Sequence, residues 1–186
     1  MMRSSSGIGL VFALCLLSAA GTPVLAQDPL SPRLQIGINL LPAVIAANNG
    51  LAKFTENDSL PIYFVYLENN HIAELLNRSI DRIGEIKQRQ LDARAISLEE
   101  LLARDIAPMS TIFVAEPLVD RLGELIEYSK ARRALLFSPF KGDVDRGVAS
   151  GFHVTDRVRP LVNLETLKQS KIQLKAFFLR IAVKHE

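Results

Sequence analysis

The stretch Arg132–Asn163, RRALLFSPFKGDVDRGVASGFHVTDRVRPLVN, guides the interpretation of the whole chain. It opens with a short apolar run, Ala134–Phe137, whose length and polar flanks indicate a buried strand. A polar loop that contains glycine follows. After it come two runs, Val148–Val154 and Val158–Val162, with the composition of a β-hairpin. The stretch therefore predicts a strand, a loop and a hairpin in succession.

The side-chain pattern of this hairpin predicts its register. A two-residue loop would place Phe152 opposite Arg159, so that apolar and charged side chains would share one face. A three-residue loop, residues 155–157, places Phe152 opposite Pro160 and His153 opposite Arg159 on the outer face. A shift of one residue turns every side chain to the other face, so the second register is predicted. Pro160 cannot donate to a ladder, and its strand is therefore expected at a sheet edge or with a bulge.

Residues 1–26 have the three parts of a secretory signal peptide. Arg3 is the charge of the leading segment, the apolar run Ile8–Leu17 follows, and small residues lead up to Ala26. The apolar run is too short to cross a membrane, and so is every later stretch. We expect cleavage near Ala26 and a soluble periplasmic domain over residues 27–186, without stable membrane insertion afterwards.

Composition excludes several classes of function. The chain has 22 Lys and Arg against 20 Asp and Glu, a net charge of +2, which gives no case for binding nucleic acid. The single cysteine, Cys15, lies in the predicted signal peptide, so a disulfide, a thiolate metal site and a cysteine nucleophile are excluded from the exported domain. His71, His153 and His185 are scattered without metal-ligand spacing, so we expect no metal and no cofactor.

Sequence motifs of catalysis are missing. There is no glycine-rich nucleotide loop of the G-x-G-x-x-G or G-x-x-x-x-G-K-[ST] type and no G-x-S-x-G elbow. Ser138 and Ser150, near His153, are the only candidates for a nucleophile and its base. We therefore expect no enzyme, and an exported hydrolase is the least favoured interpretation.

The rest of the chain alternates between helical and strand patterns. Helices are predicted at Leu34–Ala47, after Asn69-Asn70, from Ser97 to near Asp105, at Leu118–Lys130 opened by Pro117, from Leu164, and around Phe177–Ile181 after a brief extended link. Strands are predicted at Leu60–Leu67, Leu91–Ile96 and Thr111–Ala115. This alternation predicts one α/β domain, with a mixed, mostly parallel sheet, flanking helices, a C-terminal β-hairpin and a closing helix.

Basic side chains gather around the predicted hairpin. Its register brings Lys141, Arg146, Arg157 and Arg159 towards one end and one face, with His153 beside Arg159. Charge on an edge strand is also an ordinary protection against aggregation. The functional alternative is a docking patch for an acidic partner or a small anion.

The order of segments in the C-terminal third resembles the YfiR-like family of small exported bacterial proteins. The segments that carry the resemblance are Ala134–Phe137, Gly147–Phe152, Arg157–Asn163, Ile172–Lys175 and Phe177–Ala182. In that family a glycine-led strand is followed by a strand that ends in asparagine, a link that contains lysine, and a last helix rich in leucine. The upstream order of helices and strands fits the family as well.

The resemblance implies a periplasmic regulator. A member of the family restrains a membrane-bound diguanylate cyclase by binding its periplasmic sensor domain. The partner expected here is accordingly the periplasmic domain of a sensor or cyclase, and a homodimer is left open. The alternative function is a periplasmic ligand-binding or transport-associated protein that holds a small anion at the strand ends.

Overall fold

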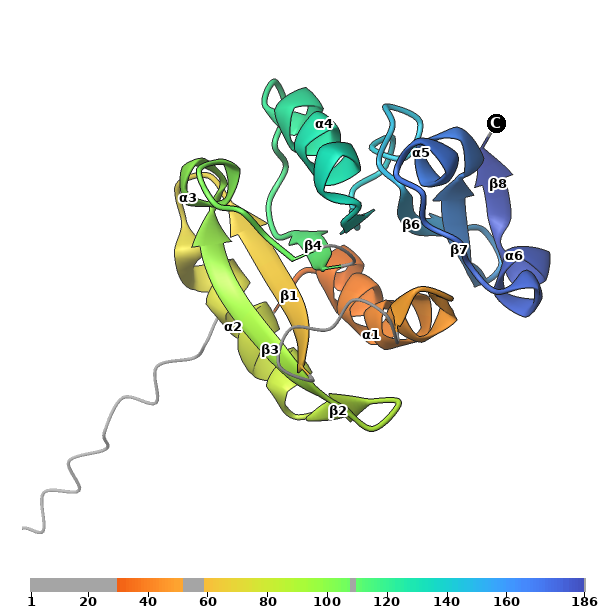
Figure 1. Cartoon of the computed structure of the whole chain (residues 1–186), viewed down its shortest axis with the longest axis horizontal. Helices are drawn as coiled ribbons and strands as arrows, with labels where there is room; N and C mark the ends of the chain where they lie inside the picture. The colour runs from red at the N-terminus through yellow and green to blue at the C-terminus, as the bar shows by residue number, and fades with distance from the viewer. Residues whose placement is uncertain (1–29, 52–58, 108–109, 186) are drawn as a thin grey trace, which may run out of the picture.

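Eight strands form one sheet in the order β2-β3-β1-β4-β5-β6-β7-β8 in the computed structural model, which describes residues 30–51, 59–107 and 110–185 (Figure 1). The strands are β1 (Ser59–Tyr66), β2 (Glu85–Ile86), β3 (Arg89–Ser97), β4 (Thr111–Val114), β5 (Leu135–Phe137), β6 (Ser150–Val154), β7 (Val158–Asn163) and β8 (Val183–His185). The helices are α1 (Pro32–Ala47), α2 (Asn70–Asp81), α3 (Leu98–Leu102), α4 (Leu122–Arg132), α5 (Leu164–Gln169) and α6 (Ala176–Ile181).

Most strand pairs in the sheet are parallel. β3, β1, β4, β5 and β6 run in one direction, whereas β2 pairs antiparallel with β3 and β7 pairs antiparallel with β6. The predicted single α/β domain with a mixed, mostly parallel sheet is confirmed. The predicted hairpin register is confirmed too, since Phe152 pairs with Pro160 and His153 with Arg159.

Two local predictions are wrong. β7 is not an edge strand, because β8 pairs with its residues Leu161–Asn163. Pro160 lies just before that paired segment, so its missing amide hydrogen costs no bond to β8. The helix predicted from Leu118 begins only at Leu122: residues 118–121 form a turn, closed by a 2.7 Å bond from Arg121 N to Leu118 O.

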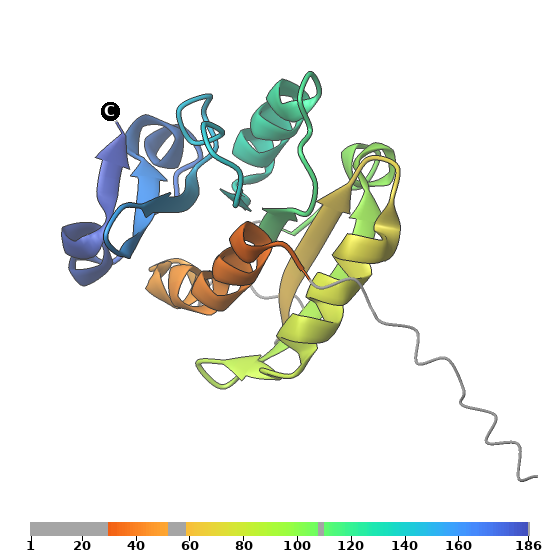
Figure 2. The ribbon, with the colours of Figure 1, turned by 180° about the vertical axis from the view of Figure 1, so that it is seen from behind.

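One face of the sheet carries a row of aromatic rings under α1 and α2. The ring centroids of Phe64 and Phe113 are 5.4 Å apart, and those of Phe113 and Phe137 are 5.3 Å apart. α1 approaches this row closely at Gly37, where an added Cβ would lie 3.2 Å from the Phe113 ring and 3.0 Å from Pro139. Figure 2 shows α1 and α2 in front of the strands on this face.

The opposite face packs against α3 and α4. Tyr63 and Val65 of β1 point into this second core, whereas Ile62 and Phe64 point into the first. β1 is thus buried on both sides, which explains why its sequence is apolar almost without interruption. α3 begins as predicted, with Ser97 Oγ accepting a 3.1 Å bond from Glu100 N.

The predicted signal peptide, residues 1–26, lies outside the described residues. Within the described ranges, no helix has the length and apolar character needed to span a bilayer.

Candidate functional site

The five predicted binding residues lie on β6, on β7 and in the loops next to these strands, in different surroundings. Lys141 and His153 line one cavity. Arg159 is the cross-strand partner of His153, as predicted. Arg157 lies at the hairpin turn, and Arg146 belongs to the loop before β6. The structure therefore brings Lys141, His153 and Arg159 into one neighbourhood.

Arg146 and Arg157 have local partners instead. Arg146 donates a 2.5 Å bond to the backbone oxygen of Val119, in the turn before α4. Arg157 Nε lies 3.4 Å from Asp156 Oδ2 in an exposed ion pair, an interaction that contributes little to stability. Arg146 is thus held at the turn before α4, and Arg157 stays at the exposed hairpin turn.

The cavity arises because β6 continues past the end of β5. These two strands share a single residue pair, Phe137 with Ser150, so β6, β7 and β8 extend beyond the parallel strands. The loop that follows β5 covers one face of this extension. It encloses a volume of about 300 Å³, lined by Phe140, Lys141, Gly142, Val144, Asp145, Phe152, His153, Leu161, Val183, Lys184 and His185. We call this the basic cavity.

The loop over the basic cavity is held in place by buried bonds. Ser138 Oγ donates a 2.5 Å bond to Asp143 Oδ2, and Asn163 Nδ2 donates a 3.0 Å bond to Val144 O. Gly151 lets the loop lie directly on β6, since an added Cβ would be 2.7 Å from Ser138 O. One wall of the cavity is therefore fixed before any ligand arrives.

Basic side chains outnumber acidic ones around the basic cavity. Lys141, His153, Lys184 and His185 line it with Asp145 as the acidic member, and the Nδ1 atom of His185 lies 3.2 Å from Asp145 Oδ1. This set suits an anionic group, either a carboxylate or a phosphate.

Asp143 lies beneath the loop and behaves differently from Asp145. Burial raises the pKa of the Asp143 carboxyl, and the hydrogen bond from Ser138 and the charge of Arg146 oppose the shift only in part. Ionising this carboxyl at neutral pH therefore opposes folding.

The hairpin turn next to the basic cavity exposes both charge and apolar surface. Arg157 and Arg159 are exposed, and so are the paired valines Val154 and Val158, at 47% and 39%. Exposed apolar side chains rimmed by charge are typical of surfaces that bind other proteins.

The serines considered for catalysis have other partners. Ser138 donates to Asp143, as above, and Ser150 Oγ donates to Leu161 O at 3.4 Å. Ser150 also points to the opposite side of β6 from His153, because the two are three residues apart in one strand. No group of three His, Cys, Asp or Glu side chains suited to a metal ion occurs in residues 30–51, 59–107 and 110–185.

Sequence reasoning missed the two other basic residues that line the cavity, Lys184 and His185. Both belong to β8, which was not predicted, because its three residues contain a single apolar side chain and show no alternation. The excess of Lys and Arg after Leu164 was the available signal, although it does not indicate pairing with β7.

Comparisons with known proteins give a likeness in fold alone. No family model matches the chain, and no curated protein matches it. A crystal structure described as the ABC domain in complex with L-Trp, from Streptococcus pneumonia, superposes with a TM-score of 0.50 at 11% identity. The match covers 82% of this chain and 60% of the other, so the chain spans about three fifths of that protein. The class that fold and site define is an α/β domain with a basic cavity at one end of its sheet.

Proposed function

We propose that this chain is an exported binding protein, without catalytic activity, that recognises an acidic group of its partner at the basic cavity and the adjoining hairpin. The observation that carries the proposal is the convergence of Lys141, His153 and His185 on one cavity. A fixed wall favours binding, because less conformational freedom is lost when the partner arrives.

The partner we propose is the periplasmic domain of a membrane-bound signalling protein, such as a diguanylate cyclase. Two features support this: the resemblance to the YfiR-like family, and the exposed surface of Arg159 and Val158 beside the cavity. Such a regulator acts only if it binds one state of the sensor more tightly than the other. Restraint of the cyclase requires tighter binding to its inactive state.

Charge reversal on the hairpin tests the regulatory role. The variant Arg157→Glu/Arg159→Glu is expected to fold normally, since exposed charges contribute about 0–1 kcal/mol each. Its affinity for the periplasmic domain of a neighbouring cyclase should fall, and wild-type binding should weaken as salt is raised. A matched control is Arg78→Glu/Arg82→Glu, which makes the same charge change at the end of α2. Equal affinities for wild type and both variants at every salt concentration would refute the docking surface.

A second candidate function is binding of a small anion, as in a transport-associated protein. The observation that favours it is the fold likeness to a protein whose structure is described as a complex with L-Trp. In this chain the basic cavity would hold the ligand's carboxylate. Calorimetry with amino acids and small carboxylates, on wild type and Lys141→Gln, separates the two functions. Saturable binding of a small ligand to wild type that is lost in the variant supports transport. Binding of the partner domain in the absence of any small ligand supports regulation.

A further inference from the structure

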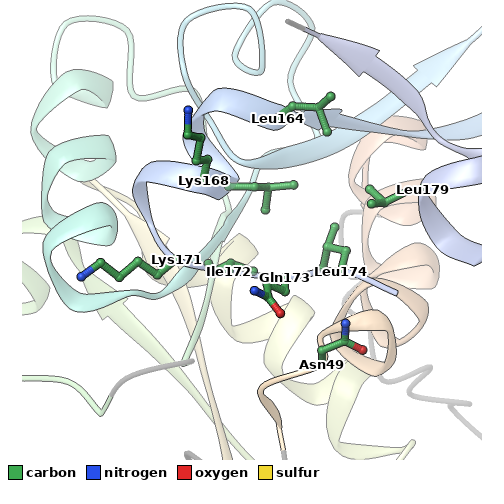
Figure 3. A pocket seen from close by; sticks show the side chains of 9 residues that line it. Asn49, Leu164, Lys168, Lys171, Ile172, Gln173, Leu174 and Leu179 are labelled. Carbon is green, nitrogen blue, oxygen red and sulfur yellow. The ribbon is translucent and has the colours of Figure 1, made fainter. Parts of the chain in front are cut away.

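A second hollow lies between the end of α1, α5, the link 170–175 and α6 (Figure 3). Its volume is about 570 Å³, and its lining residues are Asn49, Leu164, Leu167, Lys168, Lys171, Ile172, Gln173, Leu174 and Leu179. We call it the apolar hollow. It shares no lining residue with the basic cavity.

The link that forms one side of the apolar hollow is tied to the end of α1. Asn49 N donates to Gln173 O and Lys175 N donates to Ala47 O, both at 2.8 Å. Asn48 and Leu174 form an isolated antiparallel bridge between these bonds. The hollow is therefore bounded by backbone that is already ordered.

The side chains around the apolar hollow separate into an apolar interior and a polar rim. Figure 3 shows Leu164, Leu174 and Leu179 surrounding one space, with the amides of Asn49 and Gln173 at one edge. Lys168 and Lys171 lie at another edge, and their ammonium groups point outwards in different directions. Five of the nine lining residues are apolar and four are polar or charged. A pocket of this size that combines an apolar interior with polar groups is typical of sites for small organic ligands.

The charges at this rim define the sign of the ligand. Lys168 and Lys171 are its ionisable members, and no carboxylate occurs among the lining residues in the described part of the chain. The neighbouring Lys175 does not line the hollow, since its ammonium donates a 2.9 Å bond to Ala46 O at the end of α1. Two lysines at one rim without a lining carboxylate favour an anionic ligand.

The backbone at Lys171 is in a left-handed conformation, as it is at Arg133 after α4. The φ of Lys171, 55°, lies in the left-handed region, directly after the end of α5, where Ile172 N donates to Leu167 O at 2.9 Å. Glycine or asparagine is the usual residue in this helix-ending position. The chain instead has a lysine there, at the rim of the apolar hollow, at the cost of a less favourable backbone conformation.

We infer that the apolar hollow binds a small amphipathic anion, with an acyl chain or ring among the leucines and a carboxylate at the lysines. The inference does not rest on the proposed function, because the two sites share no lining residue. Long lysine side chains can lay their methylene groups along the apolar surface and turn their ammonium ends to the carboxylate.

Dodecanoate, below its micelle concentration, is a suitable probe of the purified protein by calorimetry and by two-dimensional NMR. We expect saturable binding, with shifts in the amide signals of residues 164–179. The variant Lys168→Gln/Lys171→Gly should bind dodecanoate about three- to tenfold more weakly, as loss of two exposed charge contacts implies. Dodecanol, which lacks the charge, should bind wild type and this variant equally.

The design of this variant separates binding from folding. Lys171→Gly keeps a backbone conformation that glycine adopts readily, so thermal stability should be unchanged or higher. Leu179→Trp should fill the hollow and abolish binding of both probes. Lys141→Gln, in the basic cavity, should leave dodecanoate binding unchanged, which keeps this test distinct from that of the proposed function. Failure of dodecanoate to bind, or equal binding to wild type, Leu179→Trp and the lysine variant, would overturn the inference.

Discussion

Gly151 sets the position of the loop that covers the basic cavity. A Cβ at this residue would lie 2.7 Å from Ser138 O and 2.9 Å from a methyl of Val144. The first of these atoms is backbone, so it can move only if the loop moves. Glycine is required here for close approach, and the shape of the cavity depends on it.

The variant Gly151→Ala should therefore destabilise the fold by about 1–3 kcal/mol, the usual range for overpacking. Urea unfolding measures the change. Gly123→Ala is the control, because this helical residue has nothing within 4 Å of an added Cβ. Alanine there should stabilise by about 0.5–1 kcal/mol. A neutral result for Gly151→Ala would mean that the loop does not rest on β6.

Asp143 should give the stability a characteristic pH dependence. Burial raises its pKa above the ordinary value of 3.8, so the folded state favours the protonated form. The contribution of this group is then greatest below that value and is lost as pH rises through the raised pKa. Asp143→Asn has no charge to bury and can still accept the bond from Ser138.

The stability of Asp143→Asn relative to wild type should accordingly improve between about pH 4 and about pH 7. Urea unfolding of both proteins at the two pH values gives their free energies of unfolding. The m-value of the wild type at each pH shows whether the surface exposed on unfolding has changed. A constant difference between the two proteins would show that the carboxyl is as well solvated in the folded as in the unfolded state.

At the scale of the element, the central strands are held by the aromatic row. Phe113 contacts the rings of Phe64 and Phe137 on its two sides, and all three are fully buried. Phe113→Ala would leave a cavity between its neighbours that helix α1 is too tightly packed to fill. The expected loss is about 3–5 kcal/mol. A melting curve shifted by only a degree or two would mean that β4 packs loosely, contrary to its complete burial.

The predictability of each element follows from where its pattern originates. β1 and β4 could be predicted because strands buried on both faces are apolar throughout. The hairpin register could be predicted because the pair Phe152 and Pro160 is buried, whereas the next pair, His153 and Arg159, is exposed. The predicted start of α4 was too early. Leu118 is buried and lies at helical spacing from Leu122, but it belongs to the turn that precedes the helix. β8 could not be predicted, because α5 and α6 separate it in the chain from its partner β7.

The candidate site shows the same division. Lys141 and His153 were predicted because loop and hairpin lie close together in sequence. Their neighbours Lys184 and His185 reach the cavity only through the parallel pairing of β7 with β8. Register within a hairpin is a local property, whereas the position of a distant strand depends on how the whole sheet is completed.

At the scale of the whole molecule, the sheet divides into two blocks, because β5 and β6 share a single residue pair. We call the junction between these two strands the seam. β2, β3, β1, β4 and β5 form one block, and β6, β7 and β8 form the other, with α5 and α6 beside them (Figure 1). α1 bridges the seam near Arg33, whose guanidinium donates a 2.7 Å bond to Pro139 O and lies 4.7 Å from the Phe152 ring centroid.

A domain built in this way should open in stages. Native-state hydrogen exchange is expected to show β6 and β7 exchanging through a partial opening of lower free energy than the global unfolding that exposes β1 and β4. Arg33→Ala should lower the first free energy more than the second. Identical exchange free energies in both blocks would show that the seam transmits cooperativity fully. In a molecule that opens in stages, most lining residues of both proposed sites lie in the block that opens first or in the loop that leads into it. A ligand or partner bound at either site would therefore stabilise that half of the domain against partial opening.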